Sequence, residues 1–398
     1  MFLTKEEERV LSGYEGEAKR LAMKLVVRVG EALGAPRLVK ISHAHVSGIS
    51  YDNIGEEGLQ FIRELVKLRA RVSVFSTFNP AGVPLELDEP YNPLRSDPHF
   101  VSKQLEIVAA LEKMGFTYSA TCTPYELRPP KPGEHLAWGE SSAVAVANTL
   151  YGAKTNREGG PIALAAAIVG RTYYWGLHAP ENRRANSMVV YTNGGPLDEV
   201  YAGLLGYLVG EALSDTVPYV KARFRGKRSI ISLCAASAAS GNIGMCIVEK
   251  VSPDDRGPPL HPVEKLTLEM RDLERKREEI STASLDEAEL FFTGCPHHGV
   301  GYVYDILDYM SSKGYSRLTR PMWIAVRADQ KDVRKLARRL AEKNIFLLPG
   351  TCLVVSRFQR LASVIATDSL KSAFYLPRRH GVRVALSTAK AFVDRYGV

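Results

Sequence analysis

The sequence has no uninterrupted apolar run of about 18 residues, the length that a membrane-spanning helix needs, so we expect no membrane association. Its first residues, MFLTKEEERVLSG, lack the basic-then-apolar order of a signal peptide, and we therefore expect a cytoplasmic protein. Only four of the 398 residues are glutamine, while Arg, Lys and Glu are abundant. A shortage of thermolabile amides of this kind is typical of proteins from thermophiles.

Cysteine is also scarce. Five cysteines in a chain of this length are too few and too scattered for a disulfide framework. Cys234 and Cys246 lie in the stretch ISLCAASAASGNIGMCIVEK, where a free cysteine packs as a small hydrophobic residue. Cys122, Cys295 and Cys352 instead each lie where an apolar, strand-like run ends in a turn. These three need another explanation.

Charge of one sign is not concentrated anywhere in the chain. The formal net charge is +8, but basic and acidic residues alternate, as in RDLERKREE, and no basic stripe or tail is present. Mixed helical charges of this kind are typical of solvated surfaces. We therefore expect no nucleic-acid partner, whereas a modest positive excess suits an anionic small substrate.

The order of apolar patterns predicts an α/β fold with mostly parallel sheets flanked by helices. Amphipathic helical segments precede short strand-like runs, which read LVKIS, RVSVFST and FTYSAT in the first third of the chain. Ala/Gly/Leu-rich helices follow, including AVAVANTL, PIALAAAIVG and VYAGLLGYLVGEAL, and these should be buried. The composition predicts three domains, at residues 1–133, 134–285 and 286–398.

The three remaining cysteines share a local context. Their loops read TCTPYE, TGCPHH and PGTC, and each follows a predicted strand. Because ligand loops gather at the carboxyl ends of parallel strands, we expect the three loops to lie close together. The residues alone leave several interpretations open: an iron–sulfur or other soft-metal site, a zinc site completed by His297 or His298, or three unrelated buried cysteines.

Three further segments have the composition of ligand loops: SHAHVSGISY from residue 42, FSTFNP from residue 75 and WGESS from residue 138. His43 and His45, at a strand end, are interpreted as structural. Glu140 is a candidate acid, base or hydrogen-bonding group, and Lys371 is a candidate ligand for a carboxylate or a phosphate. Ordinary turns, an N-cap and a surface salt bridge would explain the same residues.

Taken together, HVSGISYDNIGEEGL, STFNPAG, TCTPYE, WGESSAVAVANTLYGAKTNREGGP, GCPH and TDSLKSAFY resemble the aconitase X family, over residues 1 to about 395. The resemblance implies a 4Fe-4S cluster with one open iron position, bound by Cys122, Cys295 and Cys352. It also implies an aconitase-like multi-domain fold that lacks the swivelling fourth domain. A separate small subunit would supply that domain, in a heterodimer or a higher hetero-oligomer.

The resemblance implies a hydro-lyase. Family members dehydrate either (R)-5-phosphomevalonate to trans-anhydromevalonate 5-phosphate, in the archaeal mevalonate pathway, or cis-3-hydroxy-L-proline. The thermophile-like composition and the short, unfused chain favour the phosphorylated substrate. One wall of the expected substrate site is formed by Gly48, Ile49, Ser50, Asn79 and Pro80, and the other by Glu140, Ser141, Ser142 and Lys371. Glu140 and Ser142 are the predicted catalytic residues on this chain, while a serine of the small subunit is the expected general base.

Two alternatives stay open at this point. One is the cis-3-hydroxy-L-proline dehydratase activity of the same family. The other is a non-catalytic iron–sulfur or zinc protein.

Overall fold

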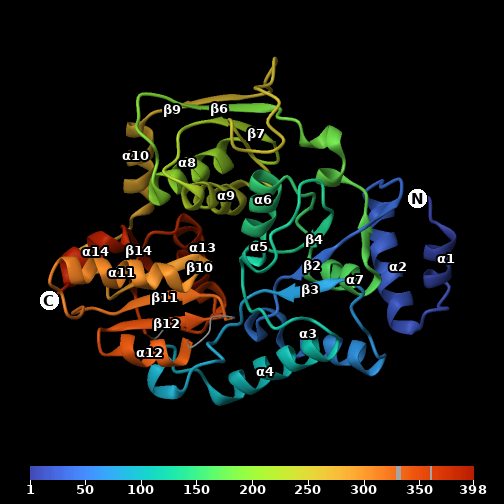
Figure 1. Cartoon of the computed structure of the whole chain (residues 1–398), viewed down its shortest axis with the longest axis horizontal. Helices are drawn as coiled ribbons and strands as arrows, with labels where there is room; N and C mark the ends of the chain where they lie inside the picture. Colours follow the sequence, from blue (N-terminus) through green and yellow to red (C-terminus); the bar gives the residue numbers. More distant parts are fainter. Residues whose placement is uncertain (329–332, 359–360) are drawn as a thin grey trace.

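The protein, described by a computed structural model over residues 1–328, 333–358 and 361–398, contains three separate parallel sheets. The strand orders are β3-β2-β4, β8-β7-β6-β9 and β12-β11-β10-β13-β14. The described strands of these sheets all pair in parallel, and the separate two-stranded sheet of β1 and β5 is antiparallel. The predicted α/β class with mostly parallel sheets is therefore confirmed. Figure 1 shows the three sheets arranged around a common centre, with the two termini at opposite ends of the molecule.

The first part surrounds the three-stranded sheet. Its central strand, β2, is buried along its whole length, with β3 on one side and β4 on the other, and α7 packs against it. Helices α3 and α4 pack together below the sheet in Figure 1. The elements are α1 (Lys5–Leu11), α2 (Glu17–Ala32), β1 (Leu38–Lys40), β2 (His43–Val46), α3 (Tyr51–Lys67), β3 (Phe75–Phe78), η1 (Glu89–Tyr91), α4 (Pro98–Lys113), α5 (Pro124–Leu127), β4 (Leu136–Trp138), α7 (Gly160–Val169) and β5 (Arg171–Tyr173).

The prediction of a strand at residues 116–121, before Cys122, is wrong. This segment runs beside β3, and two backbone hydrogen bonds join them, from Thr117 to Ser76 (2.9 Å) and from Thr121 to Phe78 (3.1 Å). Between these bonds Ala120 takes a φ of +36°, which is incompatible with an extended strand. The segment therefore follows the edge of the sheet without becoming a strand, and Cys122 still lies at the carboxyl end of β3.

The second part holds two of the three predicted Ala/Gly/Leu-rich helices, α6 and α8, and both are buried as expected; the third, α7, is equally buried but lies in the first part. Helices α8 and α9 pack closely because Gly210 faces Gly241. A side chain on Gly241 would lie 1.8 Å from the Gly210 carbonyl oxygen. The elements are α6 (Ser141–Tyr151), η2 (Gly176–His178), η3 (Pro180–Arg183), β6 (Ser187–Tyr191), α8 (Glu199–Ala212), β7 (Pro218–Lys221), α9 (Lys227–Gly241), β8 (Ile247–Val248), β9 (Lys265–Leu268) and α10 (Met270–Ile280).

The third part is a five-stranded sheet whose central strand, β10, carries Cys295. The register between β10 and β11 shifts after Thr293, so the end of β10 bulges away from the regular ladder. Helix α13 packs on α8 and α9 and so joins this part to the second one. The elements are η4 (Leu285–Glu287), β10 (Leu290–His298), α11 (Val300–Ser312), β11 (Met322–Val326), α12 (Val333–Ala341), β12 (Ile345–Pro349), η5 (Leu353–Val355), β13 (Val364–Thr367), α13 (Leu370–His380), β14 (Arg383–Leu386) and α14 (Ala389–Tyr396).

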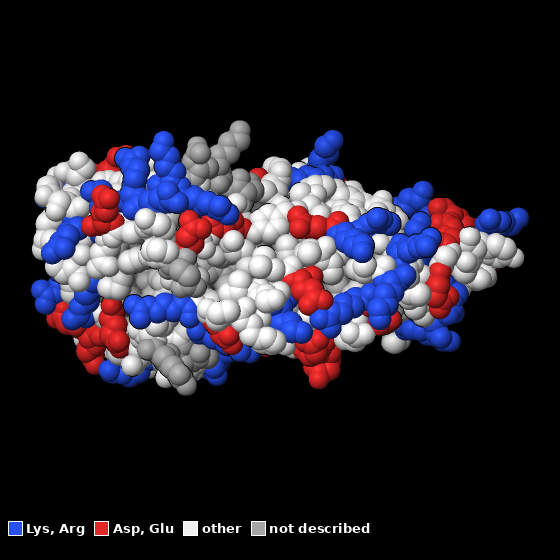
Figure 2. All heavy atoms as spheres, turned by 90° about the horizontal axis from the view of Figure 1, so that it is seen from below, with Lys and Arg blue, Asp and Glu red and all other residues white. Residues whose placement is uncertain are grey.

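The surface carries mixed charge, as the sequence predicts. Figure 2 shows Lys and Arg interleaved with Asp and Glu over the face seen from below. Within the described ranges, none of the helices has the length and apolarity to cross a membrane.

Candidate active site

A cavity of about 210 Å³ lies where the first and third sheets meet α6 and α13. It is lined by every predicted site residue except Ser142, which is fully buried directly behind Glu140. The predicted residues in the wall are Gly48, Ile49, Ser50, Asn79, Pro80, Cys122, Glu140, Ser141, Cys295, Cys352 and Lys371. The structure thus brings together residues that are more than 300 positions apart in the sequence.

The three cysteines reach this cavity from three different loops. Cys122 precedes α5, Cys295 lies in the bulged end of β10, and Cys352 follows β12. The Cys122 sulfur accepts a hydrogen bond from the backbone N–H of His297 (3.2 Å), and the Cys352 N–H donates to the Ala81 carbonyl oxygen (3.0 Å). All three are free thiols. Three cysteine sulfurs in one cavity, with a backbone N–H on one of them, form a ligand set that suits an iron–sulfur cluster.

Two glycines allow the cysteine loops to approach each other. Gly294 has a φ of +102°, and a Cβ there would lie 2.3 Å from the Ala325 carbonyl oxygen of β11. Gly350 has a φ of +58°, and a Cβ there would lie 2.9 Å from that of Ala120. Neither position accepts a side chain without moving the adjacent cysteine.

Burial raises the pKa of each of the three thiols, to about 12 for Cys352, even though the positive charge of Lys371 acts in the opposite direction. The thiols therefore keep their protons at neutral pH unless a metal displaces them. Among the described residues, no three His, Cys, Asp or Glu side chains form a group that could hold a single metal ion. His298 does not line the cysteine cavity, because its ring is bonded to Thr293 (2.7 Å) and to Arg228.

Glu140 and Lys371 form a buried ion pair in the wall of the cavity. The Lys371 ammonium donates to Glu140 and also to the Ser142 hydroxyl (3.3 Å), which in turn donates to Glu140 (3.1 Å). Burial alone would raise the pKa of Glu140, but the charge of Lys371 and the hydrogen bonds from Lys371, Asn79 and Ser142 lower it to about 2. The pKa of Lys371 is raised against its own burial, chiefly by the charge of Glu140. Both groups are therefore ionised at neutral pH.

Asn79 is held against Glu140 by a chain of hydrogen bonds from β2 and β3. Its side-chain nitrogen donates to Glu140 (2.7 Å), and its oxygen accepts from Nε2 of His45 (2.8 Å). Nδ1 of His45 then accepts from the Thr77 hydroxyl (2.8 Å), which itself accepts from Nε2 of His43 (2.8 Å). Burial lowers the pKa of His45 to about 4, so the ring is neutral, as this chain requires.

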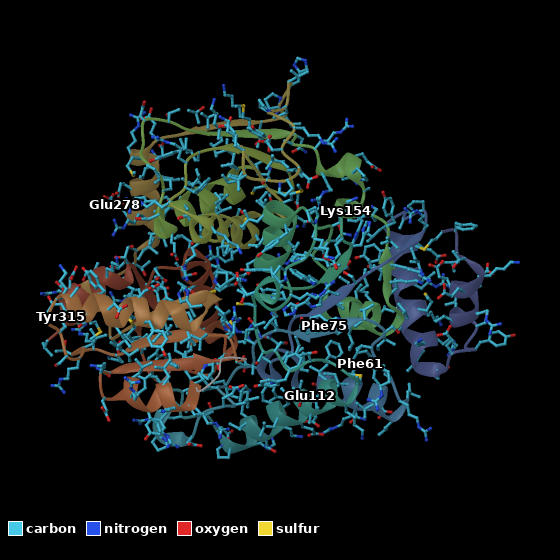
Figure 3. The ribbon with its side chains drawn as sticks, in the orientation of Figure 1. Phe61, Phe75, Glu112, Lys154, Glu278 and Tyr315 are labelled. Carbon is cyan, nitrogen blue, oxygen red and sulfur yellow. The ribbon has the colours of Figure 1, made fainter. Side chains whose placement is uncertain are left out.

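Neither His43 nor His45 lines the cavity. Both instead help to hold Asn79, which does line it, through the hydrogen bonds just described. The aromatic surroundings of His43 include Phe75, the first residue of β3, whose ring centroid lies 4.8 Å away and which is labelled in Figure 3. The sequence predicts a structural role for His43 and His45 but gives no sign of their link to Glu140. The one pattern in the sequence that points to this link is the His-x-His spacing, because residues two apart on a strand place their side chains on the same face.

Two helices begin at the cavity. Ser50 caps α3, and the preceding Gly48 has a φ of +73°. Glu140 caps α6, and Ser141 is the first residue of that helix. The first three N–H groups of α3 are already bonded to Gln104 and Ser50, so any preference for anionic groups between the two helix starts comes from the helix dipoles.

The fold is that of an aconitase-like protein, and the chain belongs to the aconitase X family. The family's first-, second- and third-domain models match residues 1–181, 186–278 and 288–397. The first-domain model extends beyond residue 133 and takes in β4, which belongs to the first sheet, and α7, which packs against it.

The chain is 38% identical to the phosphomevalonate dehydratase large subunit of Thermococcus kodakarensis, over 99% of both chains. The crystal structure of the holo-form of Thermococcus kodakaraensis aconitase X matches with a TM-score of 0.89 and 37% identity, over 100% of both chains. A cis-3-hydroxy-L-proline dehydratase of Pseudomonas aeruginosa is 32% identical, over 62% of this chain and 43% of its own length. The predicted family and aconitase-like fold are confirmed.

Proposed function

We propose that this chain is the cluster-bearing large subunit of a hydro-lyase that dehydrates (R)-5-phosphomevalonate to trans-anhydromevalonate 5-phosphate. The observation that carries the proposal is the cavity in which three cysteines, an ion pair and two helix starts meet. The choice of substrate is supported by the relative named phosphomevalonate dehydratase large subunit, which matches almost the whole chain. The hydroxyproline dehydratase relative matches a smaller share of it.

Cys122, Cys295 and Cys352 would hold the cluster. When bound by only three thiolates, a 4Fe-4S cluster supplies a Lewis-acidic iron that assists departure of a hydroxyl group. The chain's own residues bind and orient the substrate. The positive ends of the α3 and α6 dipoles attract its negative charges, and Lys371 places a positive charge in the same wall.

Glu140 is proposed to hold Lys371 and Asn79 in place and to stay ionised throughout. Its pKa of about 2 leaves it a weak proton acceptor at neutral pH. Removal of the C2 proton is therefore assigned to a partner. We propose that a separate small subunit, equivalent to the swivelling domain of aconitase, covers the cavity and supplies the base, in keeping with the name "large subunit" of the relative.

The test is an assay of the chain purified without oxygen, alone and together with its candidate small subunit. Phosphomevalonate and cis-3-hydroxy-L-proline are offered in parallel. We expect iron and sulfide in the chain, and turnover of phosphomevalonate only when the small subunit is present. Turnover of hydroxyproline alone would contradict the substrate assignment. Iron without turnover of either substrate would favour a non-catalytic cluster protein.

A further inference from the structure

Asp52 forms ion pairs with two arginines that are far away in the sequence. One of its carboxylate oxygens accepts a hydrogen bond from Nε of Arg357 (2.8 Å), and the other accepts one from Nη2 of Arg379 (2.7 Å). Asp52 lies in the first turn of α3, whereas Arg357 follows η5 and Arg379 lies in α13. A single carboxylate therefore joins the first part of the molecule to two segments of the third.

These ion pairs lie at the mouth of the cysteine cavity. Asn53, the next residue of α3, is exposed and lines the cavity, and its side-chain oxygen accepts a hydrogen bond from the same Nη2 of Arg379 (2.9 Å). Ser50 and Val355 also line the cavity, and the Ser50 hydroxyl donates to the Val355 carbonyl oxygen (3.1 Å). The contacts thus hold together two sides of the cavity wall that come from different parts of the chain.

The segment 352–357, here called the Cys352 segment, is attached to the first part at both of its ends. At the start, the Cys352 N–H donates to the Ala81 carbonyl oxygen (3.0 Å). At the end, Arg357 pairs with Asp52. Between these two points lies η5, which contributes to the cavity wall. The pair of Arg357 and Asp52 therefore limits how far this wall can move away from α3.

The first turn of α3 needs such contacts because the helix is interrupted directly after it. Gly55 has non-helical backbone angles (φ +59°, ψ −162°), so the residues before it form a turn of their own. The rest of α3 therefore does not fix the turn that carries Asp52, and the ion pairs to the third part help to do so from the opposite side.

The three charged side chains are partly exposed, by 21% for Asp52, 54% for Arg357 and 37% for Arg379. Ion pairs of this kind contribute little individually and are weakened by salt, so they open without unfolding the chain. We propose that Asp52 is a positioning residue, which holds the Cys352 segment against the first part and keeps the mouth of the cavity narrow. The consequence for a bound cluster, slower access of small molecules to it, rests on the proposed function.

Two variants break the same contacts and change the charge at the mouth in opposite directions. Asp52→Ala removes a negative charge, and the double variant Arg357→Met with Arg379→Met removes two positive charges. Glu56→Ala is the matched control, because Glu56 is also a carboxylate of α3 that pairs with two basic side chains, and both of those lie in the first part, on α3 and α4.

The first measurement is the rate at which iodoacetamide alkylates Cys352 in the iron-free full chain, read by peptide mass spectrometry. The reagent is neutral, so the charge of the mouth does not steer it. We expect the rate to rise about threefold to tenfold in both variants, the effect of one to two partly exposed ion pairs, and to stay at the wild-type value in Glu56→Ala. Salt at 1 M should raise the wild-type rate toward that of the variants and leave theirs unchanged. The fully buried Cys234 should react equally slowly in every protein, which excludes global unfolding as the cause.

The second measurement is the release of iron to 2,2′-bipyridine, a neutral chelator, from the chain loaded without oxygen. The order of the rates should be the same as for alkylation.

An alkylation rate in Asp52→Ala equal to that of wild type, or opposite changes in the two variants, would overturn the inference. Wild-type iron release from variants that are alkylated faster would overturn the role at the cluster. A chain that binds no iron would instead overturn the proposed function, and the alkylation rates would still decide whether Asp52 narrows the mouth.

Discussion

The ion pair between Glu140 and Lys371 allows the loss of folding stability on its removal to be predicted quantitatively. Replacing Lys371 by Met removes the charge that holds the buried Glu140 carboxylate in its ionised form. The pKa of Glu140 in the folded chain is about 2, below its ordinary value of 4.5. A lowered carboxyl pKa stabilises the folded state above pH 4.5, and this contribution is lost as the pH falls toward 2.

The size of the effect follows from that shift. A difference of about 2.5 pKa units corresponds to about 3 kcal/mol, and breaking a buried pair by removing one partner typically costs 3–5 kcal/mol. With an unfolding entropy of about 2.1 cal/mol/K per residue over 398 residues, 1 kcal/mol shifts Tm by about 1.2 °C. Lys371→Met should therefore lower Tm by about 4 °C at pH 7, and Glu140→Gln by a similar amount.

The assay is a double-mutant cycle on the iron-free chain, in which loss of a cluster does not contribute. Lys335→Met, at an exposed lysine of α12, is the control. The double variant should be little less stable than either single one, which corresponds to a coupling energy of about 3 kcal/mol. If the effects of the two substitutions on stability simply add at pH 7, the reasoning is refuted. Each buried charge would then be stabilised independently of the other.

Three further predictions concern the surroundings of the site. Burial raises the pKa of Glu158 to about 7 despite hydrogen bonds from Tyr173 and Thr172, so ionisation above pH 7 is costly in the folded state. Glu158→Gln should raise the unfolding free energy at pH 8 by up to about 3 kcal/mol and leave it unchanged at pH 4, as read from denaturant midpoints. Gly294→Ala should reduce the iron bound per chain, whereas Gly299→Ala, at an open position with negative φ, should not. Thr77→Val leaves one ring nitrogen of His43 and one of His45 without a partner. The unfolding free energy, measured with denaturant, should therefore fall by about 2–4 kcal/mol. An unchanged unfolding free energy would count against the chain of hydrogen bonds.

Local patterns in the sequence predict much of the fold. The apolar helices α6, α7 and α8 are recognisable because they are hydrophobic nearly all round, and they are buried. The strand β2 is harder to recognise because HAHV contains two histidines and therefore reads as part of a ligand loop. Its imidazoles are tolerated in a buried central strand because Thr77 of β3 hydrogen-bonds to both of them and Asn79 to His45.

The candidate site is predictable as a set of residues and not as an arrangement. The family resemblance points to the residues, and the structure places all but Ser142 in one cavity wall. The pairing of Glu140 with Lys371 depends on how α6 and α13 both pack on α9, and the link from His297 to the Cys352 loop depends on the carbonyl of Thr351. Contacts between segments so far apart in the chain leave no local pattern in the sequence.

The central claim, that three particular cysteines hold one cluster, is tested most directly by measuring iron and sulfide in five single variants. Each of the five cysteines is replaced by Ala and each protein is purified without oxygen. Iron and visible absorption should be lost in the variants of Cys122, Cys295 and Cys352, and kept in those of Cys234 and Cys246, which are buried away from the cavity. Full iron in any of the first three variants, or loss of iron in either of the last two while the chain stays folded, would contradict the account.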